Sequence, residues 1–256
     1  MRGMLKRIGW ELWLPIVVIV AWWVLSSGSQ SFYFPPLSKI FQSFHQDWLF
    51  AHVPTDLWPS LRRLLAGFFI GTALGIVIGL ILGVVRPLEV AVTPITEFFR
   101  AMPSAAILPI MVLLFGLGVE MKVAIIAFVT FFPVLLNTID GVRALDPLLG
   151  DVAKGYRIRF MDRMLYMYLP AASPQLFAGA RVAVSMSVIA MTVSEMVGTP
   201  GGMGYFVLDA QRGYAIPSMW SGIIALGILG YVLNKLFLLI ENRVLSWHRG
   251  MTALQG

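Results

Sequence analysis

Few residues in this sequence have the types and spacing that catalysis or metal binding would need. The 256 residues include three histidines and no cysteine, which excludes disulfides and thiolate metal sites. The histidines (His45, His52 and His248) are far apart, whereas an active site needs clustered histidine and carboxylate groups. The sequence also lacks a G-x-x-x-x-G-K-S/T phosphate loop, so it has no ATP site of that kind. We therefore expect a protein that is not an enzyme and that holds no metal or cofactor of its own.

Polar residues inside long apolar stretches are the best candidates for a binding site. Arg181, Ser185, Thr192 and Glu195 share one such stretch, and polar groups in apolar segments usually face a cavity or a partner. Arg181 would suit a small anion, but we favour a second interpretation in which it reaches lipid headgroups or pairs with a carboxylate. Glu195 is either a hydrogen-bond acceptor near a gate or a partner for Arg212.

Composition indicates the kind of element that must position these residues. The chain is 58% hydrophobic and 12% charged, with a mean hydropathy of +0.82. Ordinary soluble domains have about 45–50% apolar and about 25% charged residues. The composition excludes a soluble enzyme, a disordered tail and a fibrous repeat, and it indicates an integral membrane protein. The net charge of +6 then concerns membrane orientation and is not a signal for nucleic acid.

Six apolar segments approach the roughly 20 residues that a helix needs to cross a bilayer. We predict an all-α, polytopic fold with six transmembrane helices at Trp10–Ser27, Leu64–Val85, Ala101–Val119, Val123–Ile139, Gln175–Met196 and Met219–Ile240.

Basic residues predict the orientation of these spans. With cytoplasmic N and C termini, twelve Lys and Arg residues fall inside: Arg2, Lys6, Arg7, Arg86, Arg100, Arg143, Lys154, Arg157, Arg159, Arg163, Arg243 and Arg249. Five fall outside: Lys39, Arg62, Arg63, Lys122 and Arg212. The pair Arg62–Arg63 would snorkel to headgroups at the outer end of the second span.

The first span has an alternative interpretation as a cleaved signal peptide, but its length and its terminal tryptophans favour a retained helix. The proline-rich connection from Gln30 to Ser60 is expected to form short helices at the outer surface.

The second span carries glycines at every fourth position. Small residues let helix backbones touch in lipid, and steps of four residues wind a groove around the helix. We predict a close neighbouring helix that crosses at an angle, as a moving contact, as static packing or as a dimer contact, along Gly67, Gly71, Gly75, Gly79 and Gly83.

The longest inside loop, between Asp140 and Pro174, contains an amphipathic pattern. Apolar residues recur every four positions from 151 to 168, opposite a mixed-charge side. We predict one short helix with Asp151 at its N-terminus and Pro170 as its stop. Such a helix would lie on the membrane surface, act as a connector, or dock in a protein groove.

Residues 151–170, DVAKGYRIRFMDRMLYMYLP, resemble the "EAA" loop of ATP-binding-cassette (ABC) importer permeases of type I. Further stretches resemble the nitrate/sulfonate/taurine branch: SLRRLLAGFFIGTALGIVIGLILG at 60–83, FRAMPSAAILPIMVLLFGLG at 99–118, FFPVLLNTIDGV at 131–142, LPAASPQLFAGARVAVS at 169–185 and EMVGTPGGMGYFV at 195–207. Together they cover most of residues 60–242.

The resemblance implies roles for single residues. Asp151, Ala153, Leu169 and Pro170 match the acidic, alanine and closing positions of the loop, and Tyr156 and Phe160 would anchor an ATPase subunit. The family glycine falls at Arg157, whereas this chain has Gly155 two residues earlier, so either the turn is shifted or the ATPase meets a basic surface. Met102 and Pro103 would lie near the cytoplasmic mouth, and Gly202 and Gly204 in a glycine-rich outer loop.

The resemblance also implies an assembly and a location. Two permease copies, as a homodimer, would form the pathway in a bacterial inner membrane, with ATP and Mg on two cytoplasmic ATPases. An extracytoplasmic binding protein would deliver a small solute, with a small organic or inorganic anion such as a sulfonate, taurine or nitrate as the expected class. We expect an N-terminal helix and outer connection at 1–57, the permease domain at 58–242 with a coupling loop at 143–174, and a cytoplasmic tail at 243–256. The alternative, a proton- or sodium-coupled secondary transporter, would need buried carboxylates, whereas every Asp and Glu except Glu195 falls in a loop or at the end of a predicted span.

Overall fold

The computed structural model describes residues 2–198 and 200–247, and all regular elements in these ranges are helices. In chain order they are α1 (Arg2–Ser26), α2 (Leu37–Gln46), η1 (Asp47–Ala51), η2 (Val53–Leu57), α3 (Trp58–Val84), α4 (Arg86–Arg100), α5 (Ser104–Phe115), α6 (Val119–Arg143), α7 (Pro147–Gly155), α8 (Phe160–Arg163), η3 (Met164–Tyr168), α9 (Leu169–Glu195), α10 (Met203–Arg212) and α11 (Ile216–Val244). Most of the predicted tail at 243–256 lies outside the described residues.

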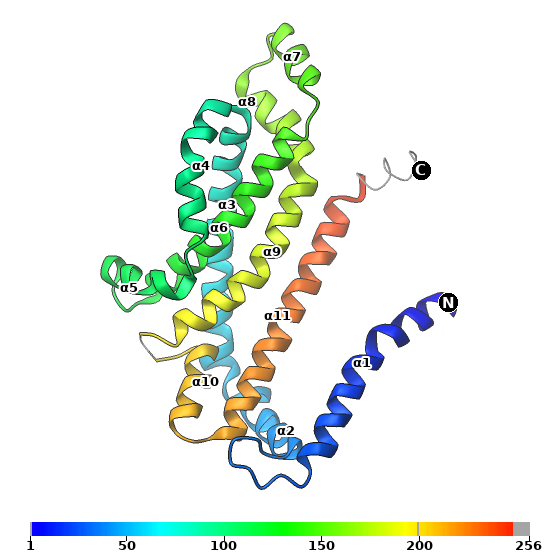
Figure 1. The fold of residues 1–256 in the computed structure, drawn as a ribbon, viewed down its shortest axis with the longest axis vertical. Helices are drawn as coiled ribbons and strands as arrows, with labels where there is room; N and C mark the ends of the chain where they lie inside the picture. Colours follow the sequence, from blue (N-terminus) through cyan, green and yellow to red (C-terminus); the bar gives the residue numbers. More distant parts are fainter. Residues whose placement is uncertain (1, 199, 248–256) are drawn as a thin grey trace.

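Three long helices form the centre of the molecule, and α6 lies between α3 and α9 (Figure 1). The glycine groove of α3 faces α6. A Cβ atom added to Gly67 would lie 2.6 Å from Ile126 Cβ, and one added to Gly83 would lie 2.7 Å from Val142 Cβ. The predicted close helix contact is therefore present, and its partner is a helix of the same chain.

The second face of α6 meets α9 in the same way. A Cβ atom on Gly179 would lie 2.6 Å from the carbonyl oxygen of Pro133, and one on Gly141 would lie 2.9 Å from Ala172 Cα. Glycines on both faces of α6 thus bring three backbones close together, as expected where packing rather than the hydrophobic effect holds helices in lipid.

Four helices among the described residues are long and apolar enough to cross a membrane by themselves: α3 with η2, α6, α9 with the helical residues before it, and α11. They contain four of the predicted spans. A bent pair, α4 and α5, would make a fifth crossing.

The predicted third span, Ala101–Val119, is wrong as a single helix. The chain bends by 99° between α4 and α5, and α5 has 12 residues, about 18 Å, against a hydrocarbon thickness of ~30 Å. Pro103 causes the break because a proline disfavours helical geometry at the residue before it. Gly116, at φ +72°, ends α5. Helix α4 was missed because four charged residues interrupt its apolar pattern.

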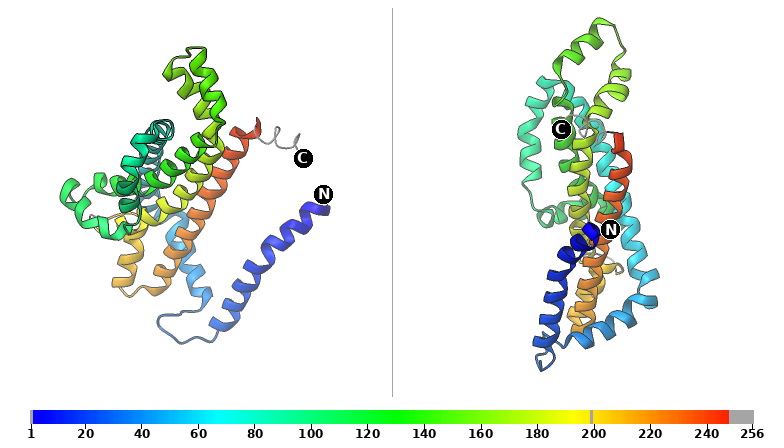
Figure 2. Two further views of the ribbon diagram at one scale, coloured as in Figure 1. Left: turned by 45° about the horizontal axis from the view of Figure 1, so that its top comes forward. Right: turned by 90° about the vertical axis from the view of Figure 1, so that its right-hand side faces the viewer.

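The first predicted span lies in α1, whose described apolar part, Trp13–Ser26, is shorter than the four spans above. Helix α1 leans away from the bundle in Figure 1 and in the left view of Figure 2. It contacts the rest of the molecule near its end, where Trp22 packs edge-on against Trp220.

The two ends of the bundle differ in construction. At one end, the α7 end, α7 projects beyond the other helices; at the other, the α10 end, lie α2, η1, η2 and α10 (Figures 1 and 2). The connection from Gln30 to Ser60 does form short helices, as predicted.

Candidate functional site

Two groups of predicted site residues lie at opposite ends of one continuous helix. Phe160–Glu195 forms a helical segment of 36 residues, about 54 Å long. Its first residues belong to the projecting tip, which we define as residues 146–163, and its last residue is Glu195. The tip and the surroundings of Glu195 are the candidate functional sites.

Helix α7 of the tip begins at a capping residue and ends at a turn with a left-handed residue. Asp146 is the N-cap and its carboxylate accepts a hydrogen bond of 2.9 Å from the backbone N–H of Leu148, with Pro147 in the first turn. The prediction that Asp151 begins the helix is wrong, since it lies in the middle of α7 and pairs with Lys154 at 2.9 Å.

The single predicted helix over 151–168 is also wrong, because the chain turns between α7 and α8. Arg157 has φ +54°, the Ile158 N–H donates to the Ala153 carbonyl at 3.1 Å, and the Arg157 N–H donates to the Lys154 carbonyl at 2.9 Å. This pair of bonds is a Schellman motif, whose left-handed position usually holds glycine. The turn is therefore not shifted to Gly155: it occurs at Arg157, in the register where the resemblance placed a glycine.

The turn divides the predicted apolar row into two parts. Val152, Tyr156 and Phe160 stay exposed on the tip, with 80% of Tyr156 accessible. Met164 is buried and Tyr168 half-buried, and both pack at the base of the tip with Leu80, Val142 and Ala172. Ala153, in contrast to its neighbours, is 4% exposed on the bundle side of α7, while Gly155 is exposed.

Pro170 does not stop the helix, contrary to the prediction. Leu169 and Pro170 form the first turn of α9, directly after the π-helical turn η3. Proline lacks the N–H that an α-helix would use, and the wider turn before it lets the helix continue.

Glu195, which is 1% exposed, forms the centre of the second site. Its carboxylate accepts hydrogen bonds from Ser60 Oγ at 2.8 Å, from Arg63 Nη1 at 2.8 Å and from the Gly204 N–H at 3.1 Å. Lys122 is also 1% exposed and lies within electrostatic range of Arg63 and Glu195. We call Ser60, Arg63, Lys122 and Glu195 the Glu195 cluster. The alternative that Glu195 pairs with Arg212 is wrong.

The glycine-rich segment predicted as an outer loop closes over this cluster. Gly202 has φ +110°, and a Cβ atom there would lie 2.5 Å from both carboxylate oxygens of Glu195, so only glycine fits. The first backbone N–H groups of α10 find side-chain acceptors: Gly202 donates to Asp56 Oδ1 and Met203 donates to Ser60 Oγ, each at 2.9 Å. The cluster therefore caps α10 and joins it to α3 and α9.

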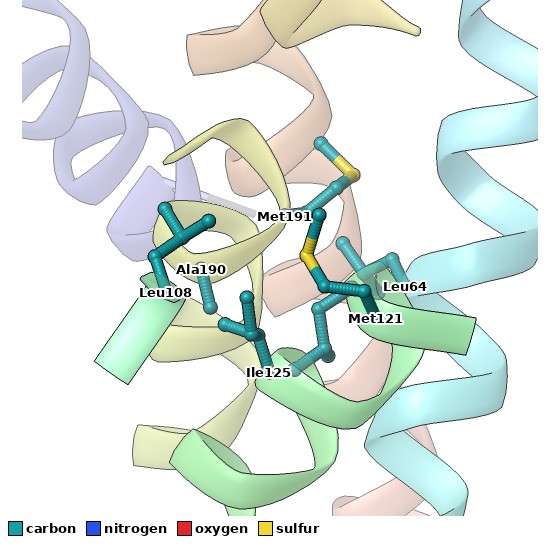
Figure 3. Packing of buried hydrophobic residues seen from close by; sticks show 7 residues of the cluster. Leu64, Leu108, Met121, Ile125, Ala190 and Met191 are labelled. Atoms are coloured by element: carbon teal, nitrogen blue, oxygen red, sulfur yellow. The ribbon is translucent and has the colours of Figure 1, made fainter. Parts of the chain in front are cut away.

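An apolar layer lies directly beneath the cluster. Figure 3 shows Met121 and Met191 side by side with Leu64, Leu108, Ile125 and Ala190 around them. Leu64 and Met121 are the chain neighbours of Arg63 and Lys122. Since this layer is buried, the ionic groups are surrounded by protein, where charge interactions are screened less than in water.

The other predicted pathway residues do not join the cluster. Arg181 pairs with Glu241 of α11, with Nε 3.1 Å from Oε2, in agreement with the favoured interpretation that it meets a carboxylate. Ser185 is exposed, and the Thr192 hydroxyl bonds its own helix at Val188.

Met102 and Pro103 lie at the break between α4 and α5. Met102 borders a pocket of about 430 Å³, lined mostly by apolar and aromatic residues including Phe99, Phe128 and Phe132. Pro103 is the N-cap residue of α5.

Sequence reasoning missed three members of the cluster. Sequence reasoning placed Ser60 in the outer connection, Arg63 at the outer end of the second span and Lys122 in an outside segment, and Arg63 lies 132 positions from Glu195. One signal in the sequence pointed to this contact. The basic pair Arg62–Arg63 lies next to an apolar run on the predicted outer side, where it needs either lipid headgroups or a buried acidic residue. Among the described residues, no group of three or more His, Asp or Glu side chains could hold a metal ion.

Comparisons with known proteins agree with this arrangement. Residues 71–246 match the family described as "Binding-protein-dependent transport system inner membrane component". The chain is 30% identical over 246 residues to a protein named as an aliphatic sulfonates transport permease, SsuC of Bacillus subtilis, covering 94% of this chain and 89% of that protein. It is 23% identical to the taurine transport system permease TauC of Escherichia coli, covering 91% and 87%.

The fold is also found in solved structures. A structure titled as an inward-facing conformation of the MetNI methionine ABC transporter has a chain with a TM-score of 0.63 and 21% identity, covering 74% of this chain and 94% of that one. The sequence match extends over more than half of the chain and includes α6, α9 and the tip between them. The chain therefore belongs to the binding-protein-dependent transport system inner membrane components, as a permease subunit of an ABC importer.

Proposed function

We propose that the tip is the surface through which a separate ATPase drives this permease. The observation that carries the proposal is the exposure of Tyr156, Ile158 and Phe160 at 80%, 45% and 46% on a segment that projects beyond the bundle (Figure 1). Apolar side chains gathered on a protruding surface are typical of a protein interface. A helix that simply lay on the membrane would not project along the bundle axis.

Chemical details of the tip support a protein partner. Arg157 and Arg159 flank the exposed apolar residues, and the Arg163 guanidinium lies 5.9 Å from the Phe160 ring centre. The Arg163 Nε is buried and has no hydrogen-bond partner within the described residues. A partner with an apolar pocket rimmed by carboxylates would fit this surface.

The proposed topology places the α7 end in the cytoplasm of a bacterium and the α10 end outside its inner membrane. Arg143, Lys154, Arg157, Arg159 and Arg163 gather near the α7 end, which supports this direction. Helix α1 and the bent pair α4–α5 would complete six crossings, with both termini cytoplasmic.

The proposed assembly contains two permease copies as a homodimer, two ATPase subunits that bind ATP and Mg, and an extracytoplasmic binding protein. The domain limits, 58–242 for the permease with its coupling loop at 143–174, are part of the proposal. In it, Asp151, Ala153, Gly155, Tyr156, Arg157, Phe160, Leu169 and Pro170 couple the permease to the ATPase. Met102, Pro103, Arg181, Ser185, Thr192, Glu195, Gly202 and Gly204 remain candidates for the pathway or gate.

The proposed substrate is a small organic anion of the sulfonate class, because similar chains are named for aliphatic sulfonates and taurine. The contrasting case is ThiX of Halalkalibacterium halodurans, 29% identical and named for formylaminopyrimidine. Uptake of radiolabelled taurine, competed with unlabelled alkanesulfonates or formylaminopyrimidine, separates the two classes.

Purification in mild detergent tests whether an ATPase binds the tip. The wild-type chain, purified from its own cells, should be recovered with one ATPase per permease. Replacing both Tyr156 and Phe160 by Ala should remove the ATPase, whereas Tyr33→Ala, an aromatic residue 65% exposed near the α10 end, should not. Recovery of wild-type permease alone would contradict the proposal. Uptake that stops with an uncoupler but not with vanadate would favour a secondary transporter.

A further inference from the structure

Helix α9 connects two places that must move together if the tip is driven. Its helical segment from Phe160 to Glu195 is continuous, so a displacement of the tip can be carried along it to the far end. The ion pair of Arg181 with Glu241 links the middle of this segment to α11, and it does not involve Glu195 at the far end.

The far end is fastened by buried charge rather than by apolar packing alone. The Glu195 carboxylate holds the Arg63 guanidinium at 2.8 Å, and the relative exposures of their side chains are 0% and 12%. The Arg63 guanidinium also donates to the Gly201 carbonyl at 3.2 Å. Separating the carboxylate from the guanidinium without admitting water would leave a buried charge unpaired, which is strongly unfavourable. We therefore expect a partly opened form of this ion pair to be rare.

Three segments distant in sequence share this contact. Ser60 and Arg63 come from α3 and Lys122 from α6, while Gly201 and Gly202 precede α10 and Gly204 lies in its first turn. The carboxylate of Asp56, in η2, accepts a hydrogen bond from the Gly202 N–H, and its second oxygen lies 2.7 Å from His52 Nδ1. The start of α10 therefore cannot be displaced from α9 while the cluster is intact.

We propose that Glu195 is a positioning residue of the transport cycle, clamping the end of α9 to α3 and to residues 200–204 at the start of α10, so that displacement of the tip moves this segment. The inference rests on the proposed function, because it requires an ATPase that acts on the tip. It assigns the charge of Glu195 to transmission of movement and not to contact with substrate.

The absence of cysteine from the sequence allows a direct test. Val197→Cys places a thiol between the end of α9 and the segment at residues 200–204, at a position that is 40% exposed. The reporter is the rate at which a membrane-impermeant maleimide labels this thiol in the complete complex in liposomes, without nucleotide and after trapping with Mg-ATP and vanadate. This readout does not require the substrate to be known.

With Glu195 intact, the labelling rate should differ several-fold between the two nucleotide states. Glu195→Gln, which keeps the shape but removes the charge, should make the two rates equal while vanadate still arrests ATP hydrolysis. Ser60→Ala, which removes one hydroxyl and little volume, should reduce the difference in the same direction and serves if Glu195→Gln does not fold. Glu241→Gln is the matched control, since it breaks the Arg181 pair, and it should retain the full difference.

Each alternative outcome is distinguishable. A role of Glu195 in folding alone would lower the yield of complex but leave the nucleotide-dependent difference intact, which would overturn the clamp. Equal rates in the Val197→Cys reporter before any other change would also overturn it. Failure of the ATPase to assemble with the wild-type chain would overturn the proposed function together with the inference.

Discussion

The tip and the Glu195 cluster lie at the two ends of one helix and are built in opposite ways. The tip exposes apolar side chains, and its one internal ion pair, Asp151 with Lys154, is in the open with side-chain exposures of 71% and 65%. The cluster buries its charges and gives Glu195 three different donors. The exposed apolar side chains of the tip are available to a partner protein, whereas the charged groups of the cluster are bonded within the chain.

The same contrast holds for glycine. On α3 the glycines permit contact with α6, and an added methyl group at Gly71 would overlap Thr130 and the backbone of Ala127. On α7 nothing lies within 4 Å of a Cβ atom added to Gly155. One set of glycines therefore determines packing within the molecule, while the other leaves a surface free.

Breaking the ion pairs of the two regions should give the largest difference in stability. Arg63→Ala removes the cation that is hydrogen-bonded to the buried Glu195 and should lower the free energy of unfolding by about 3–5 kcal/mol. Lys154→Ala breaks an exposed pair and should change it by about 0.5 kcal/mol or less. Thermal unfolding in detergent measures both, and equal shifts of the midpoint would contradict the contrast.

Adding a methyl group to a glycine of each region should have the next largest effect. Gly71→Ala forces α3 away from α6 and should destabilise the protein by about 1–3 kcal/mol. Gly155→Ala, in a helical and open position, should be neutral or stabilise α7 by about 0.5–1 kcal/mol. Chemical unfolding followed by tryptophan fluorescence tests the first variant, and amide exchange in α7 tests the second. A destabilised Gly155→Ala would show that the tip packs against something within the chain.

A small effect is expected from relaxing the turn of the tip. Arg157→Gly removes the strain of a left-handed residue, about 1–2 kcal/mol, but glycine loses about 0.5–1 kcal/mol through its greater freedom when unfolded. The net stabilisation should be about 0.5 kcal/mol, seen as slower amide exchange at Ile158, whose N–H closes the motif. Faster exchange at Ile158 would mean that the arginine side chain itself supports the turn.

Sequence patterns predicted the features that depend on local periodicity. Steps of four between the α3 glycines predicted a close neighbour, and apolar length alone predicted the four helices that are long and apolar enough to cross a membrane. Length could not reveal the break at Pro103, since Ala101 and Met102 before it are apolar like α5 after it, and the amphipathic α4 lies outside the apolar run.

The sites were predictable in part for the same reason. Glu195, Gly202 and Gly204 were candidates from the sequence, but Arg63, which pairs with Glu195, was not, because a contact across 132 positions leaves no periodic trace. At the tip, the resemblance placed the turn at Arg157, whereas the helical period of residues 151–168 continued unbroken through it. A single residue with positive φ overrode that pattern.

The most direct test of the central claim is a crosslink from the tip. A benzophenone attached to a single cysteine at Tyr156→Cys should, on illumination, form a covalent product with the ATPase subunit, and the same probe at Tyr33→Cys should not. We predict that the crosslinked product of the probe at position 156 contains the ATPase subunit and forms in complexes that hydrolyse ATP. An active complex in which the Tyr156 probe reacts with lipid alone, or in which the Tyr33 probe captures the ATPase, would contradict it.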